Sequence, residues 1–296
     1  MSEDKKVHFK HGRTHLFMVL LILIWAIDSV TISMAMDSVN QVFLVCAKYA
    51  FALPIVILVV AIRHGIRLPR RKDIVHLLVS ALFGDVLYFF FEYTALKYLS
   101  VSMVTILLGF LPVASYLTDC VVQRRKPDWL SLLAIGISIF GLVLVVSTKT
   151  EEQGNSVIGY LCCAACLAVW IVYGYLTRSM ESTYNSTTIT MYQMVFAFGM
   201  MLPIALTHFP SSLFSRDFWI SIVLMGILSS GIGCLIEVKG LIDLGTTISG
   251  IYLNLLPVFT AMAGVIFLHE RMTLIQCIGS ILIIVCGFIV EKRDQT

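Results

Sequence analysis

The stretch from Glu92 to Val113, EYTALKYLSVSMVTILLGFLPV, recurs 145 residues later as EVKGLIDLGTTISGIYLNLLPV, from Glu237 to Val258. The two stretches align without a gap and share the glutamate at the start and Leu-Pro-Val at the end. The same spacing joins Trp25 to Trp170. Repetition at a fixed period indicates a chain built from copies of one unit, and here we expect two copies, residues 1–150 and 151–296.

The composition places both copies in a membrane. Hydrophobic residues make up 58% of the chain and charged residues only 13%, whereas soluble domains carry about 25% charged residues. In a membrane protein, the net charge of +3 does not indicate binding of nucleic acid. The eight cysteines lie mostly in apolar runs, without the spacing of disulfides or zinc sites. We expect lipid and a small-molecule substrate as partners, with no cofactor and no metal ion.

Apolar runs long enough to span a bilayer follow one another along the chain. The first copy supplies five, at about 14–34, 41–62, 74–96, 101–121 and 128–147. The second copy supplies five more, at about 157–177, 187–207, 217–240, 247–268 and 273–290. The predicted fold is an all-α membrane protein of ten transmembrane helices.

Basic residues predict the orientation, because lysine and arginine are retained on the cytoplasmic side. They gather in alternate connections, including residues 5–13, 63–72 and 124–126, and again near the C-terminus. Both termini are therefore expected in the cytoplasm, in the cytoplasmic membrane of a bacterium. Because five is odd, the second copy begins on the opposite side, so the two five-helix repeats are inverted. Inverted repeats typically hold a substrate site near the midplane and support alternating access.

Two stretches resemble the signature segments of the EamA family, which belongs to the drug/metabolite transporter superfamily. They are ALKYLSVSMVTILLGFLPV, from Ala95 to Val113, and GLIDLGTTISGIYLNLLPVFTAMAGVIFLHERMT, from Gly240 to Thr273. The resemblance covers the whole chain. It implies a carrier of small organic solutes whose third, fourth, eighth and ninth helices help to line the cavity. Members of this family handle amino acids, nucleotide sugars, amines and quaternary ammonium compounds.

Ionisable side chains inside spans are costly and are functional candidates by default. Asp119 and Lys239 fall near the cytoplasmic boundary, where their charges can reach interfacial water. Asp28 and Lys48 lie at similar depth on adjacent spans. They can form a structural ion pair, or Asp28 can serve the substrate; both interpretations stay open.

Asp85 and Glu92 are seven residues apart, so they share one face of the third span. Because the membrane interior disfavours a charged carboxylate, we expect one or both to bind substrate and to take up and release a proton in the course of the substrate cycle. Glu237 repeats the place of Glu92 and is a third coupling candidate. A packing role shared by Glu92 and Glu237 is the alternative.

Trp25 and Trp170 stand near mid-depth of their spans, away from the interfacial belt where tryptophan concentrates. Tyr173 follows Trp170, and Asp28 follows Trp25 by three residues. Aromatic faces beside carboxylates suit an organic cation. We therefore predict a cation box of Trp25, Trp170 and Tyr173; tryptophan as a packing residue is the alternative.

Pro112 and Pro257 occupy matching places inside the fourth and ninth spans. A proline frees a backbone carbonyl one turn back and bends its helix. Asn254 stands three residues before Pro257, where the first copy has Gly109. We expect Asn254 to hydrogen-bond the substrate and the cavity to be chemically asymmetric.

The chain has no nucleotide-binding loop and no protease motif. The predicted function is a secondary carrier, monomeric or homodimeric and without catalytic residues, for an amine or a quaternary ammonium cation, with possible proton coupling. An exporter of neutral or aromatic amino acids is the first alternative, and an intramembrane enzyme is the second.

Overall fold

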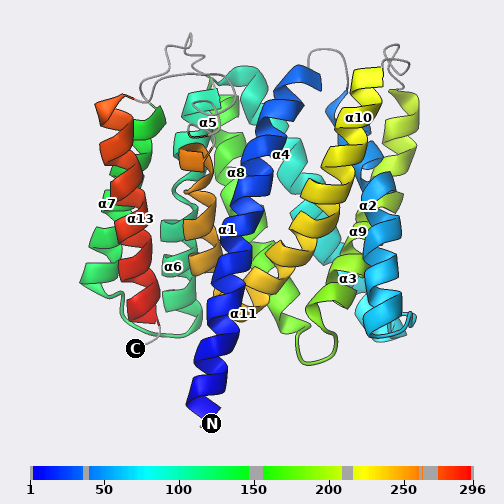
Figure 1. Cartoon of the computed structure of the whole chain (residues 1–296), viewed down its shortest axis with the longest axis horizontal. Coiled ribbons are helices and arrows are strands. Elements are labelled where there is room, and N and C mark those ends of the chain that lie inside the picture. Colours follow the sequence, from blue (N-terminus) through cyan, green and yellow to red (C-terminus); the bar gives the residue numbers. More distant parts are fainter. Residues whose placement is uncertain are drawn as a thin grey trace. The chain divides into compact units, whose positions relative to one another are not determined.

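The chain folds into helices because a backbone in a bilayer must satisfy its own hydrogen bonds within each segment. The computed structural model describes residues 3–35, 40–99, 101–146, 156–208, 216–259, 262 and 273–294, and these contain helices and no strand (Figure 1). The α-helices are α1 (Glu3–Ala35), α2 (Gln41–Arg63), α3 (Ile74–Ala81), α4 (Tyr88–Tyr98), α5 (Val101–Leu108), α6 (Leu111–Val122), α7 (Trp129–Val146), α8 (Val157–Ser179), α9 (Ser186–Thr207), α10 (Arg216–Leu224), α11 (Cys234–Leu253) and α13 (Leu274–Asp294). Three other helical segments are the 3-10 turn η1 (Arg71–Asp73) and the π-helical segments η2 (Leu82–Leu87) and η3 (Met225–Gly233).

Seven helical runs within the described residues are long and apolar enough to cross a membrane. The predicted all-α membrane class is therefore confirmed. The span expected at 14–34 lies within α1. The span expected at 247–268 continues past the described residues, so the number ten stays a prediction.

Contacts divide the chain into two units, each built from both halves of the sequence. The first unit combines Met1–Phe90 with Val172–Asp243, and the second combines Phe91–Ile171 with Leu244–Thr296. The chain passes between the units inside α4, α8 and α11. These compact units differ from the two repeats predicted at 1–150 and 151–296. The division into those repeats stays a prediction.

In the first unit, α2 packs along α9, which occupies the matching place in the second copy. The side chains of Asn40 and Asn185 cap these two helices by accepting hydrogen bonds from backbone N–H groups. The Tyr192 hydroxyl near the start of α9 donates to the Arg67 carbonyl beyond the end of α2, at 2.6 Å. The two helices are therefore antiparallel, as inverted copies require.

Tyr184, just before α9, is hydrogen-bonded to the segment between α2 and α3. Its hydroxyl donates to the Asp73 carboxylate at 2.8 Å and accepts the Arg70 backbone N–H at 3.0 Å. Burial raises the pKa of the Tyr184 phenol, and the neighbouring Asp73 carboxylate also raises it. The phenol therefore remains protonated and keeps its donor at neutral pH.

The π-helical segments recur in both copies, because η2 shifted by the repeat spacing falls within η3. A π turn is wider than an α turn and is frequent at functional sites. In η3, a Cβ on Gly226 would lie 2.8 Å from the Lys48 carbonyl oxygen of α2. Glycine therefore lets the η3 backbone approach α2 closely.

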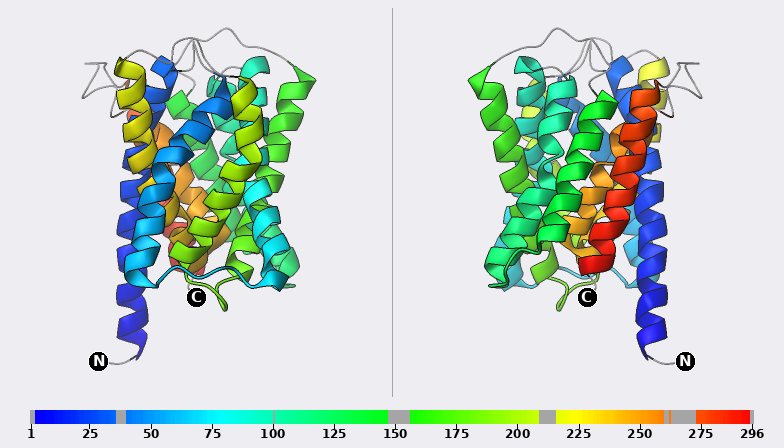
Figure 2. Two further views of the ribbon diagram at one scale, coloured as in Figure 1. Left: turned by 90° about the vertical axis from the view of Figure 1, so that its right-hand side faces the viewer. Right: turned by 90° about the vertical axis from the view of Figure 1, so that its left-hand side faces the viewer.

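In the second unit, α7 runs antiparallel to α13, again its counterpart in the other copy (Figure 2). Glycines lie at the crossing: a Cβ on Gly141 would come within 2.7 Å of the Gly279 carbonyl oxygen. Two helices are also interrupted at matching places. One break is at Gly109–Phe110, just before Pro112, and the other is at Asn254–Leu255, just before Pro257. Each proline, at which the sequence predicts a bend, thus follows a helix break in its copy.

The close crossing of α7 and α13 predicts opposite effects for two glycines of one helix. Gly141→Ala should destabilise the protein by about 1–3 kcal/mol, because the added methyl overlaps the α13 backbone. Gly136→Ala meets nothing within 4 Å and should gain about 0.5–1 kcal/mol from helix propensity. Thermal unfolding of the detergent-purified variants measures both. Equal stability of the two variants would contradict the crossing.

Candidate functional site

Lys48 of α2 and Asp28 of α1 form a buried ion pair in the first unit. Lys48 Nζ lies 3.0 Å from Asp28 Oδ2, and the two side chains are 11% and 8% exposed. The Ser229 hydroxyl of η3 donates to the same oxygen at 2.5 Å. The pair predicted as one of two possibilities is therefore present. A substrate role for Asp28 remains a prediction.

Gln193 of α9 occupies the place of Lys48 in the second copy. Its Nε2 group donates to the Ser80 hydroxyl at 2.6 Å and to the Thr177 hydroxyl at 2.8 Å. All three residues are buried. The Gln193 amide oxygen, Oε1, is also buried and has no hydrogen-bond partner among the described residues. A neutral amide in this copy thus ties helices together where the other copy uses an ion pair.

Asp85 lies in η2, and its carboxylate accepts a hydrogen bond from the Tyr49 hydroxyl of α2. Tyr49 is 2% exposed, so this bond is sheltered from solvent. Within the described part of the chain, no lysine, arginine or histidine forms an ion pair with Asp85. Asp85 differs in this respect from Asp28, whose charge is matched by Lys48.

A small polar cavity in the first unit connects Asp85 to α8, α9 and α11. It is lined by Asp85, Tyr173, Thr190, Gln193, Met194, Cys234 and Val238. Its volume is about 10 Å³, which is about the space that one water molecule needs. The structure therefore brings together two of the predicted site residues, Asp85 and Tyr173.

Tyr173 reaches this cavity because its neighbour on η2 is a glycine. A Cβ on Gly84 would lie 2.3 Å from the Tyr173 ring, far closer than side chains can pack. The residue before Asp85 thus sets where the aromatic ring lies. Tyr173 is 5% exposed, so its ring is held inside the protein.

The second unit contains its own buried polar contacts. Asn254 Nδ2 donates to the Gly109 carbonyl at 3.2 Å, which joins the two helix breaks. Asp119 accepts a hydrogen bond from the Thr247 hydroxyl at 2.8 Å. Asn254 therefore has a partner inside the protein, and its predicted contact with substrate is untested.

A family model matches the chain twice, over residues 12–147 and 157–290, and its description is the EamA-like transporter family. The chain belongs to this family. The expected resemblance is confirmed, and so is the coarse function: an integral membrane protein of a transporter family.

Relatives of this EamA-like transporter have no established substrate in their names. An uncharacterized transporter of Archaeoglobus fulgidus is 27% identical over 96% of the chain and 99% of the relative. The uncharacterized transporter YyaM of Bacillus subtilis is 22% identical over 80% of each chain. The chain also matches a crystal structure with a TM-score of 0.80 and 19% identity, over 96% of this chain and 99% of the other chain. This likeness shows the fold.

The remaining predicted site residues of the EamA-like chain are divided between the units. Trp25 belongs to the first unit, where its indole N–H donates to the Ser229 carbonyl at 3.4 Å. Trp170 is buried in the second unit. Glu92 belongs to the second unit and Glu237 to the first. The box of Trp25 with Trp170, and the coupling roles of the two glutamates, stay predictions.

Sequence reasoning missed four residues that surround Asp85 and Gln193: Tyr49, Thr190, Ser80 and Thr177. Each is polar within an apolar run. Tyrosine, serine and threonine are common enough in membrane helices that a single one carries little signal. The repeat offered one available clue, since it placed Gln193 opposite Lys48. Because Gln193 is polar and buried at the repeat position of Lys48, its side chain needs hydrogen-bond partners inside the protein.

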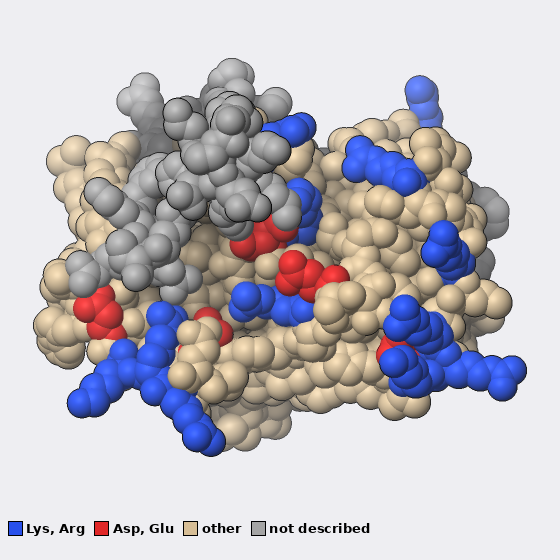
Figure 3. All heavy atoms as spheres, turned by 90° about the horizontal axis from the view of Figure 1, so that it is seen from below, with Lys and Arg blue, Asp and Glu red and all other residues tan. Residues whose placement is uncertain are grey.

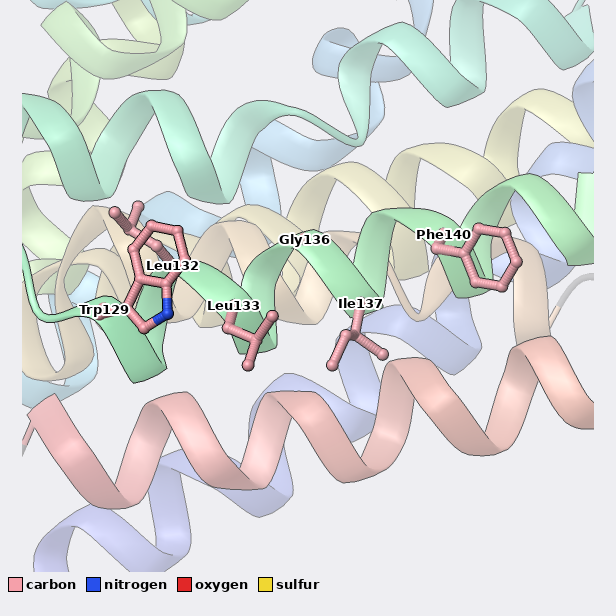
Figure 4. A pocket seen from close by; sticks show the side chains of 6 residues that line it. All are labelled: Trp129, Leu132, Leu133, Gly136, Ile137 and Phe140. Atoms are coloured by element: carbon pink, nitrogen blue, oxygen red, sulfur yellow. The ribbon is translucent and has the colours of Figure 1, made fainter.

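A larger hollow lies on the exposed side of α7 in the second unit (Figure 4). It measures about 340 Å³ and is lined by Trp129, Leu132, Leu133, Gly136, Ile137 and Phe140. This lining is apolar and Trp129 is 75% exposed, as expected for a surface that faces lipid. The groove lacks the polar groups that would recognise a charged solute, so the smaller polar cavity is the better candidate site.

The Lys48–Asp28 pair predicts strong non-additivity of its mutations. Lys48→Met should destabilise the transporter by about 3–5 kcal/mol, because it leaves the Asp28 carboxylate buried without a counter-charge. The double variant Lys48→Met/Asp28→Asn should recover most of this loss. Thermal unfolding in detergent measures the coupling between the two changes. Additive effects would show that the pair is not formed, and lost transport in a stable double variant would favour the substrate role of Asp28.

Proposed function

We propose that this EamA-like protein is a secondary carrier that exchanges an organic cation for protons, with Asp85 as the carboxyl group that binds each in turn. One observation carries the proposal. Asp85 lines a polar cavity among apolar helices and has no basic partner in the described part of the chain. An unmatched carboxylate inside a membrane protein is costly, so the group favours either a proton or a cationic ligand.

Two other acids with little-exposed side chains have basic partners. Asp28 pairs with Lys48, and Asp243 pairs with Lys239 at 2.5 Å. Asp119 also accepts a hydrogen bond from a neutral hydroxyl, that of Thr247, but it lies near the end of its span. Asp85 receives only a neutral phenol, from Tyr49. Its carboxylate is therefore best placed to attract a positive substrate, and the Tyr173 ring in the same cavity can add a cation–π contact.

The lysines within spans are already paired with aspartates, which favours a cationic substrate over an amino acid. The carboxylate of an amino acid would need a positive partner, and the sequence places two lysines within spans, Lys48 and Lys239. Both are paired with aspartates. The export of neutral or aromatic amino acids therefore remains the second candidate, supported by the range of substrates in the family. An intramembrane enzyme would release product without moving solute.

In this proposal, ten spans form two inverted repeats that expose Asp85 to each side in turn. The deprotonated carboxylate binds the cation, and protonation removes the attraction and releases it. The antiparallel pairing of α2 with α9 and of α7 with α13 supports inverted copies. Glu92 and Glu237 remain candidates for further proton binding.

Substitution of Asp85 tests the coupling. Asp85→Asn should abolish proton-driven accumulation of cation, because the amide neither binds a proton nor attracts the positive charge. Asp85→Glu should retain part of it. The measurement is uptake of benzylamine and of benzyltrimethylammonium by proteoliposomes that are acidic inside, with protein-free liposomes as the blank.

Asp119→Asn is the matched control, because it neutralises another buried aspartate that lies in the second unit. This control should keep its uptake. Proton-driven uptake that survives in Asp85→Asn but fails in Asp119→Asn would reject the assignment of Asp85. Product formed without accumulation would favour the enzyme.

We also propose that both termini and the connection from Arg63 to Lys72 face the cytoplasm. Lysine and arginine side chains are numerous on the face of the molecule drawn in Figure 3. The connection from Lys149 to Asn155, which lies outside the described residues, is expected on the external side. An impermeant thiol reagent should therefore label Asn155→Cys, but not Leu68→Cys, from outside intact cells, each in a chain without other cysteines. Leu68 is 91% exposed, so a missing reaction reflects the membrane and not burial. Labelling of Leu68→Cys alone would reverse the orientation.

A further inference from the structure

We propose that the cavity beside Asp85 receives the –NH₃⁺ group of a protonated primary amine, and that Gln193 and Thr190 select it over methylated ammonium groups. This inference rests on the proposed cation carrier and names its substrate class. It depends on the size of the cavity, on the acceptors around it, and on one buried acceptor that lacks a partner.

The size of the cavity limits what can enter. Its volume of about 10 Å³ holds about one water molecule. An –NH₃⁺ group has nearly the size of a water molecule. The carbon chain of any amine requires a side chain such as Tyr173 or Val238 to move, and a trimethylammonium group adds three further carbon atoms to that displacement. Both side chains are buried, so their displacement would disturb a packed interior.

One acceptor on η2 and two on α9 belong to residues that line the cavity, beside the phenol oxygen of Tyr173 on α8. The first is the Asp85 carboxylate of η2. The second is the Thr190 hydroxyl oxygen of α9, whose own hydrogen is donated to the Ser186 carbonyl at 2.9 Å. The third is Gln193 Oε1, also of α9. Three acceptors match the three N–H donors of a primary ammonium group.

Gln193 is oriented for this role by its other partners. Its Nε2 group donates to the hydroxyls of Ser80 and Thr177. These bonds fix the amide plane and do not use Oε1, the acceptor of a residue that lines the cavity. Gln193 is 2% exposed, and Oε1 has no partner among the described residues. A buried acceptor without a donor is costly, and a ligand N–H would satisfy it.

Methylation of the ligand removes donors one by one. A trimethylammonium ion keeps its charge for Asp85 but offers no N–H to Gln193 or Thr190. Since a hydrogen bond to a charged group in a buried site typically changes affinity by about tenfold or more, each acceptor should contribute to the preference. The preference should therefore disappear in steps as the acceptors are removed.

Two pairs of probes test the inference: benzylamine with benzyltrimethylammonium, and butylamine with butyltrimethylammonium. Isothermal titration of the purified full-length protein in detergent gives each affinity. We expect the primary amine of each pair to bind about tenfold or more tightly than its trimethylated partner. A sodium chloride titration is run beside them, because a bare cation also prefers oxygen ligands.

Thr190→Val removes one acceptor at nearly constant volume and should weaken the primary amines by about tenfold, with no change for the quaternary ions. Thr188→Val is the matched control, since Thr188 is buried on the same helix and is not among the residues that line the cavity. It should change neither affinity. Gln193→Met should act like Thr190→Val; if it fails to fold, the pair of threonine variants still decides.

Equal or tighter binding of the quaternary ions would overturn the inference. If that binding still depends on Asp85, the proposed cation carrier stands while the choice of a primary amine fails. Competition by sodium at equal concentration, or an unchanged preference in Thr190→Val, would also overturn it. If no probe binds and Asp85→Asn has no effect on uptake, both proposals fail.

Discussion

The absence of water inside the bilayer is the constraint on which the rest of this structure depends. Each backbone group and each charge must find its partner within the protein. The first unit satisfies this need with an ion pair, Lys48 with Asp28, and with an amide network around Gln193. Against this background, the Asp85 carboxylate is unusual, because the partner that it has among the described residues is the neutral phenol of Tyr49.

The helical class and the repetition could be predicted from the sequence because both depend on properties of long segments. Apolar runs define spans, and the fixed spacing placed Gly109 opposite Asn254 and Pro112 opposite Pro257 before any helix break was seen. The importance of Asp85 could be predicted for a similar reason. A carboxylate in an apolar run is conspicuous in the sequence, whichever way its helix is rotated about its axis.

The contacts of the site could not be predicted in the same way. The bond of Tyr49 to Asp85 and the bonds of Gln193 to Ser80 and Thr177 join residues far apart in the sequence. They depend on the rotation of each helix, and the π turns in η2 and η3 change that rotation. Depth alone predicted that Asp28 and Lys48 could meet. It said nothing about Ser229, which comes from the other copy.

The hydrogen bond from Asn254 to the Gly109 carbonyl has a consequence for how two copies in one chain can diverge. The two positions correspond, yet one supplies a side chain and the other a bare backbone oxygen. Two identical subunits would offer the same residue twice, and an asparagine in place of Gly109 would overlap the Leu142 side chain. Once the copies are fused, each position is free to specialise, but only in step with its counterpart. In a single chain, a contact between corresponding positions can thus consist of two complementary groups, a side-chain donor and a backbone acceptor.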